Sequence, residues 1–145
     1  MKTRQVLEAY NTLNGARLSK MDDKDKFLVI KAMRQLKPIS AAYEEFVKDA
    51  QEKLKGEDFG EIQKKAQQWQ EEGENTALSL EERRHINIYL NDYTKKVNEC
   101  VGEEGEKEND LTYERLSEEA FGRLLASNDF DVKTIMSLQD ALMTE

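Results

Sequence analysis

The chain has 145 residues, a formal net charge of −8, and 36% charged and 38% apolar residues. This length is sufficient for one domain with a buried core. One proline and seven glycines among many helix-forming residues favour an all-α fold. The single cysteine, Cys100, excludes a disulfide within the chain. No apolar run approaches the ~20 residues of a transmembrane helix, so no membrane contact is expected.

Charge is divided unevenly along the chain. Residues 1–55 carry 12 Lys and Arg against 8 Asp and Glu, a balance of +4, whereas residues 56–145 carry 10 against 22, a balance of −12. The two parts can attract each other within one chain or between chains. The acidic total disfavours nucleic acid as a partner, because such binding needs cations that neutralise phosphates. The N-terminal MKTRQVLEAY lacks the apolar segment of a signal peptide, so a cytoplasmic protein is expected.

Two helices are expected in residues 1–55. Thr3 is a suitable N-cap for a short helix, which Asn14-Gly15 ends because both residues tolerate left-handed backbone conformation. A long central helix is expected over about 23–54, because apolar residues recur there at steps of three and four. Those residues are Val29, Ala32, Leu36, Ile39, Tyr43, Phe46 and Ala50. Pro38 removes one backbone donor and predicts a kink, with two helices meeting at the proline as the alternative.

Shorter helices are expected to pack against the long one. A third helix runs from Phe59 to near Gly73, with only a narrow apolar face. Ser79 opens a fourth helix, since its hydroxyl and the carboxylate three residues later form a capping box. This helix is expected to end near Cys100–Gly102.

A charged loop, GEEGEKEND, is expected over 102–110. Leu111 and Tyr113 alternate with polar residues, which allows a minor β-hairpin near 97–115. Ser117 and Asp131 are expected to cap the last two helices. The chain is thus interpreted as one helical domain, 1–145, made of a helical hairpin (1–55), a short helix and loop (56–78) and a C-terminal helical part (79–145).

No combination of residues in the sequence indicates catalysis or metal binding. His85 is the only histidine, and Arg83 and Arg84 beside it would repel a cation. Cys100 has acidic neighbours, which oppose thiolate formation. The acidic run 103–110 lacks the residue order of a calcium-binding loop. No nucleotide-binding, metalloprotease or hydrolase motif occurs. We therefore expect no catalytic residue, cofactor site, metal site or small-molecule substrate, and no enzymatic activity.

Basic residues gather on the first half of the long helix. They are Lys20, Lys24, Lys26, Lys31, Arg34 and Lys37. One interpretation is a patch for phosphate or for an acidic partner. An ordinary solvated helix face is the favoured interpretation, because Asp22, Asp23 and Asp25 adjoin the same residues.

The long helix also has more apolar residues than packing within one chain requires. Phe27, Ile30 and Met33 lie beside the main apolar seam. Together with Tyr43 and Val47, they are the candidate interaction residues. They are expected either to receive the C-terminal helices or to contact a second protein, through self-association or with another partner.

Two stretches carry a resemblance to a known group of proteins. VLEAYNTLNGARLSKM, followed by KFLVIKAMRQLKPISAAYEEFVKDAQEKL, resembles the N-terminal helical hairpin of small uncharacterised proteins encoded by tailed phages and prophages. In those proteins a short "ALNAL-x-KL" helix precedes a long helix ending in "FE-x-x-R/K". The stretch LSEEAFGRLLASNDFDVKTIMSLQDAL resembles their closing "LS-x-x-x-F/L" segment. Phe59–Ala77 departs from the shortest members.

The resemblance implies a phage-associated interaction or assembly protein rather than an enzyme, located in the host cell cytoplasm if phage-encoded. The leading hypothesis is a non-enzymatic, self-associating module that acts through helix-face contacts. The alternative is an acidic inhibitor whose region 56–145 covers a basic surface of a host enzyme such as a nuclease.

Overall fold

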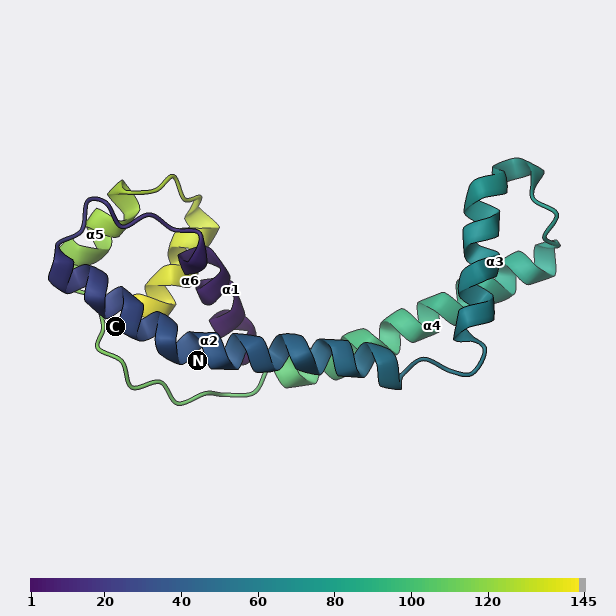
Figure 1. Cartoon of the computed structure of the whole chain (residues 1–145), viewed down its shortest axis with the longest axis horizontal. Helices are drawn as coiled ribbons and strands as arrows, with labels where there is room; N and C mark the ends of the chain where they lie inside the picture. The colour runs from purple at the N-terminus through teal and green to yellow at the C-terminus, as the bar shows by residue number, and fades with distance from the viewer. Residues whose placement is uncertain (144–145) are drawn as a thin grey trace. The chain divides into compact units, whose positions relative to one another are not determined.

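The computed structural model describes residues 1–143, which consist of helices and connecting loops (Figure 1). The α-helices are α1 (Thr3–Asn14), α2 (Asp23–Lys53), α3 (Phe59–Glu72), α4 (Leu80–Gly105), α5 (Glu118–Ala126) and α6 (Val132–Leu142). A 3₁₀ turn, η1 (Gly73–Asn75), follows α3. The predicted all-α fold is confirmed. Over the part of the chain described, no helix combines the length and apolar character needed to cross a membrane.

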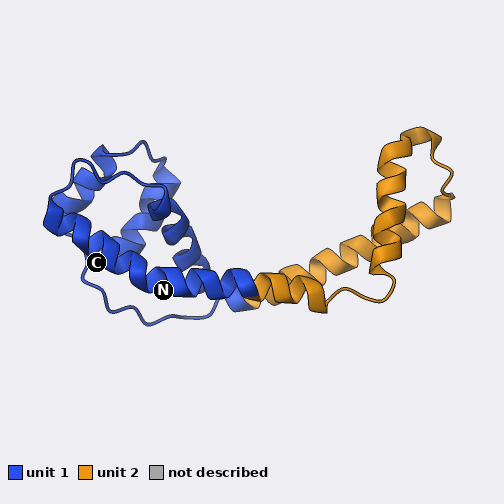
Figure 2. Ribbon diagram, viewed as in Figure 1, with its two compact units in different colours: residues 1–45, 104–145 blue, residues 46–103 orange. Residues whose placement is uncertain are grey.

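The helices form two compact units (Figure 2). Unit 1 comprises Met1–Glu45 and Glu104–Glu145, and unit 2 comprises Phe46–Glu103. The first part of α2 belongs to unit 1 and its last part to unit 2, whereas α4 lies in unit 2 except for its last two residues, Glu104 and Gly105, which belong to unit 1. This division does not follow the three consecutive segments expected from the sequence, because α2 and α4 each contribute residues to both units.

The long helix is a single element of 31 residues with Pro38 inside it. The alternative of two helices meeting at Pro38 is therefore wrong. The proline removes one backbone donor, but Leu36 and Ser40 on either side are only 0% and 2% exposed. Packing on both sides of the proline therefore keeps the helical path despite the missing hydrogen bond.

The core of unit 1 joins α1, the first part of α2, α5 and α6. Val6, Leu36, Leu124 and Leu138, one from each helix, are fully buried. The predicted caps of the last two helices are confirmed, since the Ser117 and Asp131 side chains accept hydrogen bonds from backbone N–H groups three residues later. The sequence predicts these caps correctly because an N-cap hydrogen bond involves only the first turn of its own helix.

The segment between α4 and α5 differs from the predicted β-hairpin. Residues 97–105 are helical in α4, which ends later than expected. The backbone groups beyond α4 instead pair with distant parts of unit 1: Thr3 N–H donates to Lys107 O (3.0 Å), and Leu116 N–H donates to Leu142 O (2.7 Å). Within residues 1–143 these contacts form isolated bridges only. The alternation around Tyr113 arises because this connector is extended: Leu111 and Tyr113 pack against the core of unit 1, whereas Thr112 and Glu114 are exposed.

Unit 2 has a smaller core between α3 and α4. Ile62, Leu78 and Ile86 are its buried centre, with Trp69 packed against it. At the other end of α3, the Phe59 and Tyr93 rings lie 4.7 Å apart between centroids. The Glu82 N–H donates to Ser79 Oγ (3.1 Å) at the start of α4, as expected for the predicted cap.

Two glycines of unit 2 occupy positions that a side chain would disturb. A Cβ on Gly56 would lie 2.8 Å from the Tyr89 hydroxyl oxygen. Gly73 ends α3 with φ of +59°, which only glycine adopts easily. At the end of α1, by contrast, Gly15 has φ of −102°, so the left-handed conformation expected there is wrong. That helix ends in a simple turn.

Candidate interaction surface

The five candidate residues of the long helix occupy different environments. Phe27 and Ile30 are 49% and 41% exposed. Met33 is half-buried and packs against the core of unit 1. Tyr43 and Val47 are also half-buried, Tyr43 in unit 1 and Val47 in unit 2. Of the five, only Phe27 and Ile30 are thus exposed.

The five residues do not share one side of the helix. At 3.6 residues per turn, Tyr43 and Val47 lie roughly 160° around the axis from Phe27. Steps of three and four keep residues in line over a few turns, but the small error per turn accumulates over the length of α2. The structure therefore separates an exposed pair near the start of α2 from three residues that face the protein.

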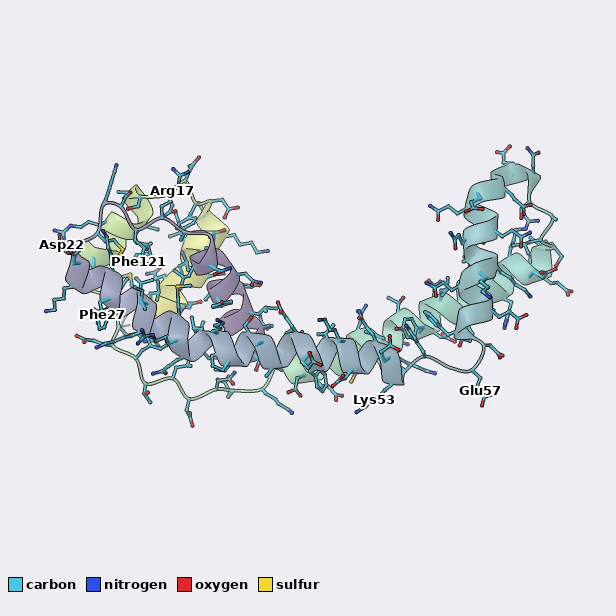
Figure 3. The ribbon with its side chains drawn as sticks, viewed as in Figure 1. Arg17, Asp22, Phe27, Lys53, Glu57 and Phe121 are labelled. Carbon is cyan, nitrogen blue, oxygen red and sulfur yellow. The ribbon has the colours of Figure 1, made fainter. Side chains whose placement is uncertain are left out.

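The exposed pair is surrounded by cations. We define the basic-apolar face as six exposed side chains on neighbouring rows of α2: Lys24, Phe27, Ile30, Lys31, Arg34 and Lys37. Between Asp25 and Glu44, α2 contains no acidic residue. Figure 3 marks Phe27 on this face and Phe121 of α5, which is only 5% exposed in the core.

The aspartates at the start of α2 form ion pairs with side chains outside the basic-apolar face. The Arg123 guanidinium on α5 lies 2.8 Å from an Asp22 carboxylate oxygen and 3.8 Å from one of Asp25. Asp23 lies 3.8 Å from the Lys26 ammonium. These pairs reduce the negative potential that the sequence placed beside the basic residues. The cations of this part of α2 are therefore less screened by neighbouring carboxylates than the sequence alone suggests.

The cations of the basic-apolar face have no carboxylate of residues 1–143 within ion-pair distance. Among the described residues, Lys24, Lys31, Arg34 and Lys37 form no salt bridge. The Lys31 ammonium instead lies over the Phe27 ring, 5.0 Å from its centroid. This cation–π contact holds an aromatic ring and a positive charge together at the surface.

The acidic segment after α4 is engaged within unit 1. Glu106 accepts hydrogen bonds from Lys2 (2.5 Å) and Arg4 (2.9 Å), and these donors hold the pKa of its carboxyl below the ordinary value. Glu108 pairs with the Met1 amino group at 2.9 Å. The part of the expected charged loop that follows α4 is therefore attached to the N-terminal residues of unit 1 by ion pairs. The attraction between basic and acidic parts that the charge distribution suggested occurs here within one chain.

A second surface feature lies between α1 and α6. It is a groove of about 520 Å³, lined on the α1 side by Arg4 and Glu8 and on the α6 side by Val132, Met136 and Asp140. Val132 and Met136 are 73% and 61% exposed. The groove mixes both signs of charge, so its lining does not indicate one kind of ligand.

The residues considered for chemistry stand apart from one another. His85 is exposed on α4, with its ring 6.2 Å from that of Tyr89, and Cys100 is a half-buried free thiol. Over residues 1–143, no three His, Cys, Asp or Glu side chains converge as metal ligands would. Comparison of the chain with protein-family models, curated proteins and solved structures finds no match.

Proposed function

We propose that this chain is a non-enzymatic protein–protein interaction module that acts through the basic-apolar face of α2. The observation that carries the proposal is the exposure of Phe27 and Ile30 among cations without carboxylate partners in residues 1–143. Exposed apolar side chains cost solvation free energy, and a cluster of them on a rigid helix is typical of an interface. A role in phage assembly remains a prediction that rests on the sequence resemblance.

Self-association through this same face is disfavoured by charge. A symmetric dimer would place Lys31 and Arg34 of one copy opposite the same residues of the other. Like charges at an interface cost free energy because they lose water without gaining a partner. A different protein is therefore the favoured occupant of the face.

The alternative of an acidic inhibitor receives less support. Glu106 and Glu108, in the most acidic stretch of the chain, are held by Lys2, Arg4 and the Met1 amino group. To cover a basic surface elsewhere, these carboxylates would have to exchange one set of ion pairs for another. Such an exchange yields little net free energy.

Site-specific photo-crosslinking tests the proposal. A photoreactive amino acid replaces Ile30 in one variant and Ile88, a 62% exposed isoleucine of α4, in the control. In the cells that make the protein, the variant at Ile30 is expected to give an adduct of defined mass with another protein. The variant at Ile88 is expected to give none.

A second substitution decides whether an adduct depends on the face. Adding Lys31→Glu to the Ile30 variant should abolish the adduct, since the charge beside Phe27 is reversed while the crosslinker stays in place. Equal adducts at both positions, or an adduct that survives Lys31→Glu, would contradict the proposal.

A further inference from the structure

We infer that the partner of the basic-apolar face presents an acidic amphipathic helix. This inference rests on the proposed function and specifies the chemistry of the partner. The four cations and two apolar side chains of the face require carboxylates and apolar groups at matching spacing. A helix with apolar residues at steps of three and four and Glu or Asp beside them supplies both.

Charge complementarity is the first support. The neighbouring aspartates are paired with Arg123 and Lys26, whereas Lys24, Lys31, Arg34 and Lys37 have no salt bridge within residues 1–143. A partner that brings carboxylates meets these four charges without having to displace an existing ion pair. The opposite potentials would orient the two helices and raise their association rate.

The dimensions of the face are the second support. From Lys24 to Lys37 the face spans about 20 Å along α2, at 1.5 Å per residue, which matches about four turns of a partner helix. Phe27 and Ile30 lie one turn apart and can receive two apolar side chains of that helix. A single pair of helix faces buries a small area, so we expect a transient complex with a Kd on the order of 10–100 μM.

Two other polyanions fit the face less well. The net charge of −8 repels an extended nucleic acid, and Ile30 would have no apolar partner along a phosphate backbone. An anionic membrane needs a broad apolar helix face to insert, whereas here Phe27 and Ile30 are flanked by Lys24, Lys31, Arg34 and Lys37. An acidic protein helix satisfies both the charges and the apolar pair.

Binding of synthetic probes tests the inference. The probe is a fluorescent 21-residue peptide with Leu at steps of three and four and Glu at the flanking positions, and its counterpart has Lys in place of Glu. Fluorescence anisotropy should show saturable binding of the Glu peptide and none of the Lys peptide. Raising the salt concentration from 0.05 to 0.5 M should weaken binding about tenfold or more, because it shortens the Debye length.

Matched variants locate the binding. Lys31→Glu with Arg34→Glu should weaken binding of the Glu peptide about tenfold or more, which corresponds to roughly 1.4 kcal/mol. Phe27→Ala with Ile30→Ala should weaken binding of the Glu peptide by a similar factor. The dependence of that binding on salt concentration should change little. The control, Lys95→Glu with Lys96→Glu, makes the same charge change at two exposed lysines of α4 and should leave the Kd within about twofold. Circular dichroism checks that each variant keeps its helices.

Several results would overturn the inference. They are equal binding of the Lys peptide, no saturation by the Glu peptide at 1 mM, or equal loss of binding in the control. Tighter binding of single-stranded DNA or of phosphatidylserine vesicles, lost in the Lys31→Glu, Arg34→Glu variant, would assign the face to another class of ligand. If the Ile30 crosslink to a protein persists after such a result, the proposed function stands and only the acidic helix is refuted.

Discussion

Leu36→Ala and Ile30→Ala together test whether the two sides of α2 have different roles. Leu36 is 0% exposed in the core of unit 1, whereas Ile30 is 41% exposed on the basic-apolar face. Both substitutions shorten an aliphatic side chain on the same helix to alanine. If the structure is correct, the first should destabilise the protein strongly and the second should affect stability little.

The magnitude follows from what each side chain loses. Leu→Ala removes three carbon groups, each worth about 0.8 kcal/mol of transfer free energy when buried, so transfer alone gives about 2.4 kcal/mol. The cavity left in a packed core raises the expected loss to ~2.7–5 kcal/mol, against a typical total stability of about 5–15 kcal/mol. Ile30→Ala should cost less than about 1 kcal/mol, because part of the side chain is already in water and alanine favours the helix.

Urea denaturation followed by circular dichroism measures both variants. With m-values of about 1–3 kcal/mol/M, Leu36→Ala should lower the midpoint by roughly 1–5 M, and Ile30→Ala by less than about 1 M. Equal shifts in the two variants would refute the assignment of a buried and an exposed side to α2. A loss below about 1 kcal/mol for Leu36→Ala would place that residue outside the core.

Three further predictions concern hydrogen bonds of unit 1. Tyr113→Phe should cost about 1 kcal/mol in denaturation, because the hydroxyl that donates to Ala141 O (2.6 Å) is lost. Burial raises the pKa of Tyr113, so at high pH the folded state retains a proton that the unfolded chain releases. The wild type should therefore lose stability above about pH 10. The phenylalanine variant, which lacks this hydroxyl, should lose less stability over the same pH range. Asp131→Ala should cost about 1 kcal/mol by removing the N-cap of α6, measured as a lowered melting temperature. An NMR titration should give Glu106 a pKa lowered from its ordinary value by the hydrogen bonds from Lys2 and Arg4, and this pKa should rise in Lys2→Ala. The associated stability is present above the unfolded-state pKa and is lost as the pH falls.

Some of the candidate surface could be predicted from the sequence. The long helix, its apolar surplus at Phe27 and Ile30, and the basic residues around them were all visible in the sequence pattern. The pattern could not separate these two residues from Met33, Tyr43 and Val47. Periodicity places residues on rows of one helix, but which rows are covered depends on the elements packed against them.

The sequence alone determined the local elements of this protein. The helices of the all-α fold and the caps at Ser117 and Asp131 depend on residues within a turn or two, so their signals are contiguous in the chain. Only the tertiary structure decided which charges remain available. The pairing of Asp22 with Arg123 joins residues 101 positions apart, and Glu106 reaches Lys2 across 104. Such pairs leave no periodic trace in the sequence, because they form only when packed helices bring distant side chains within reach of each other.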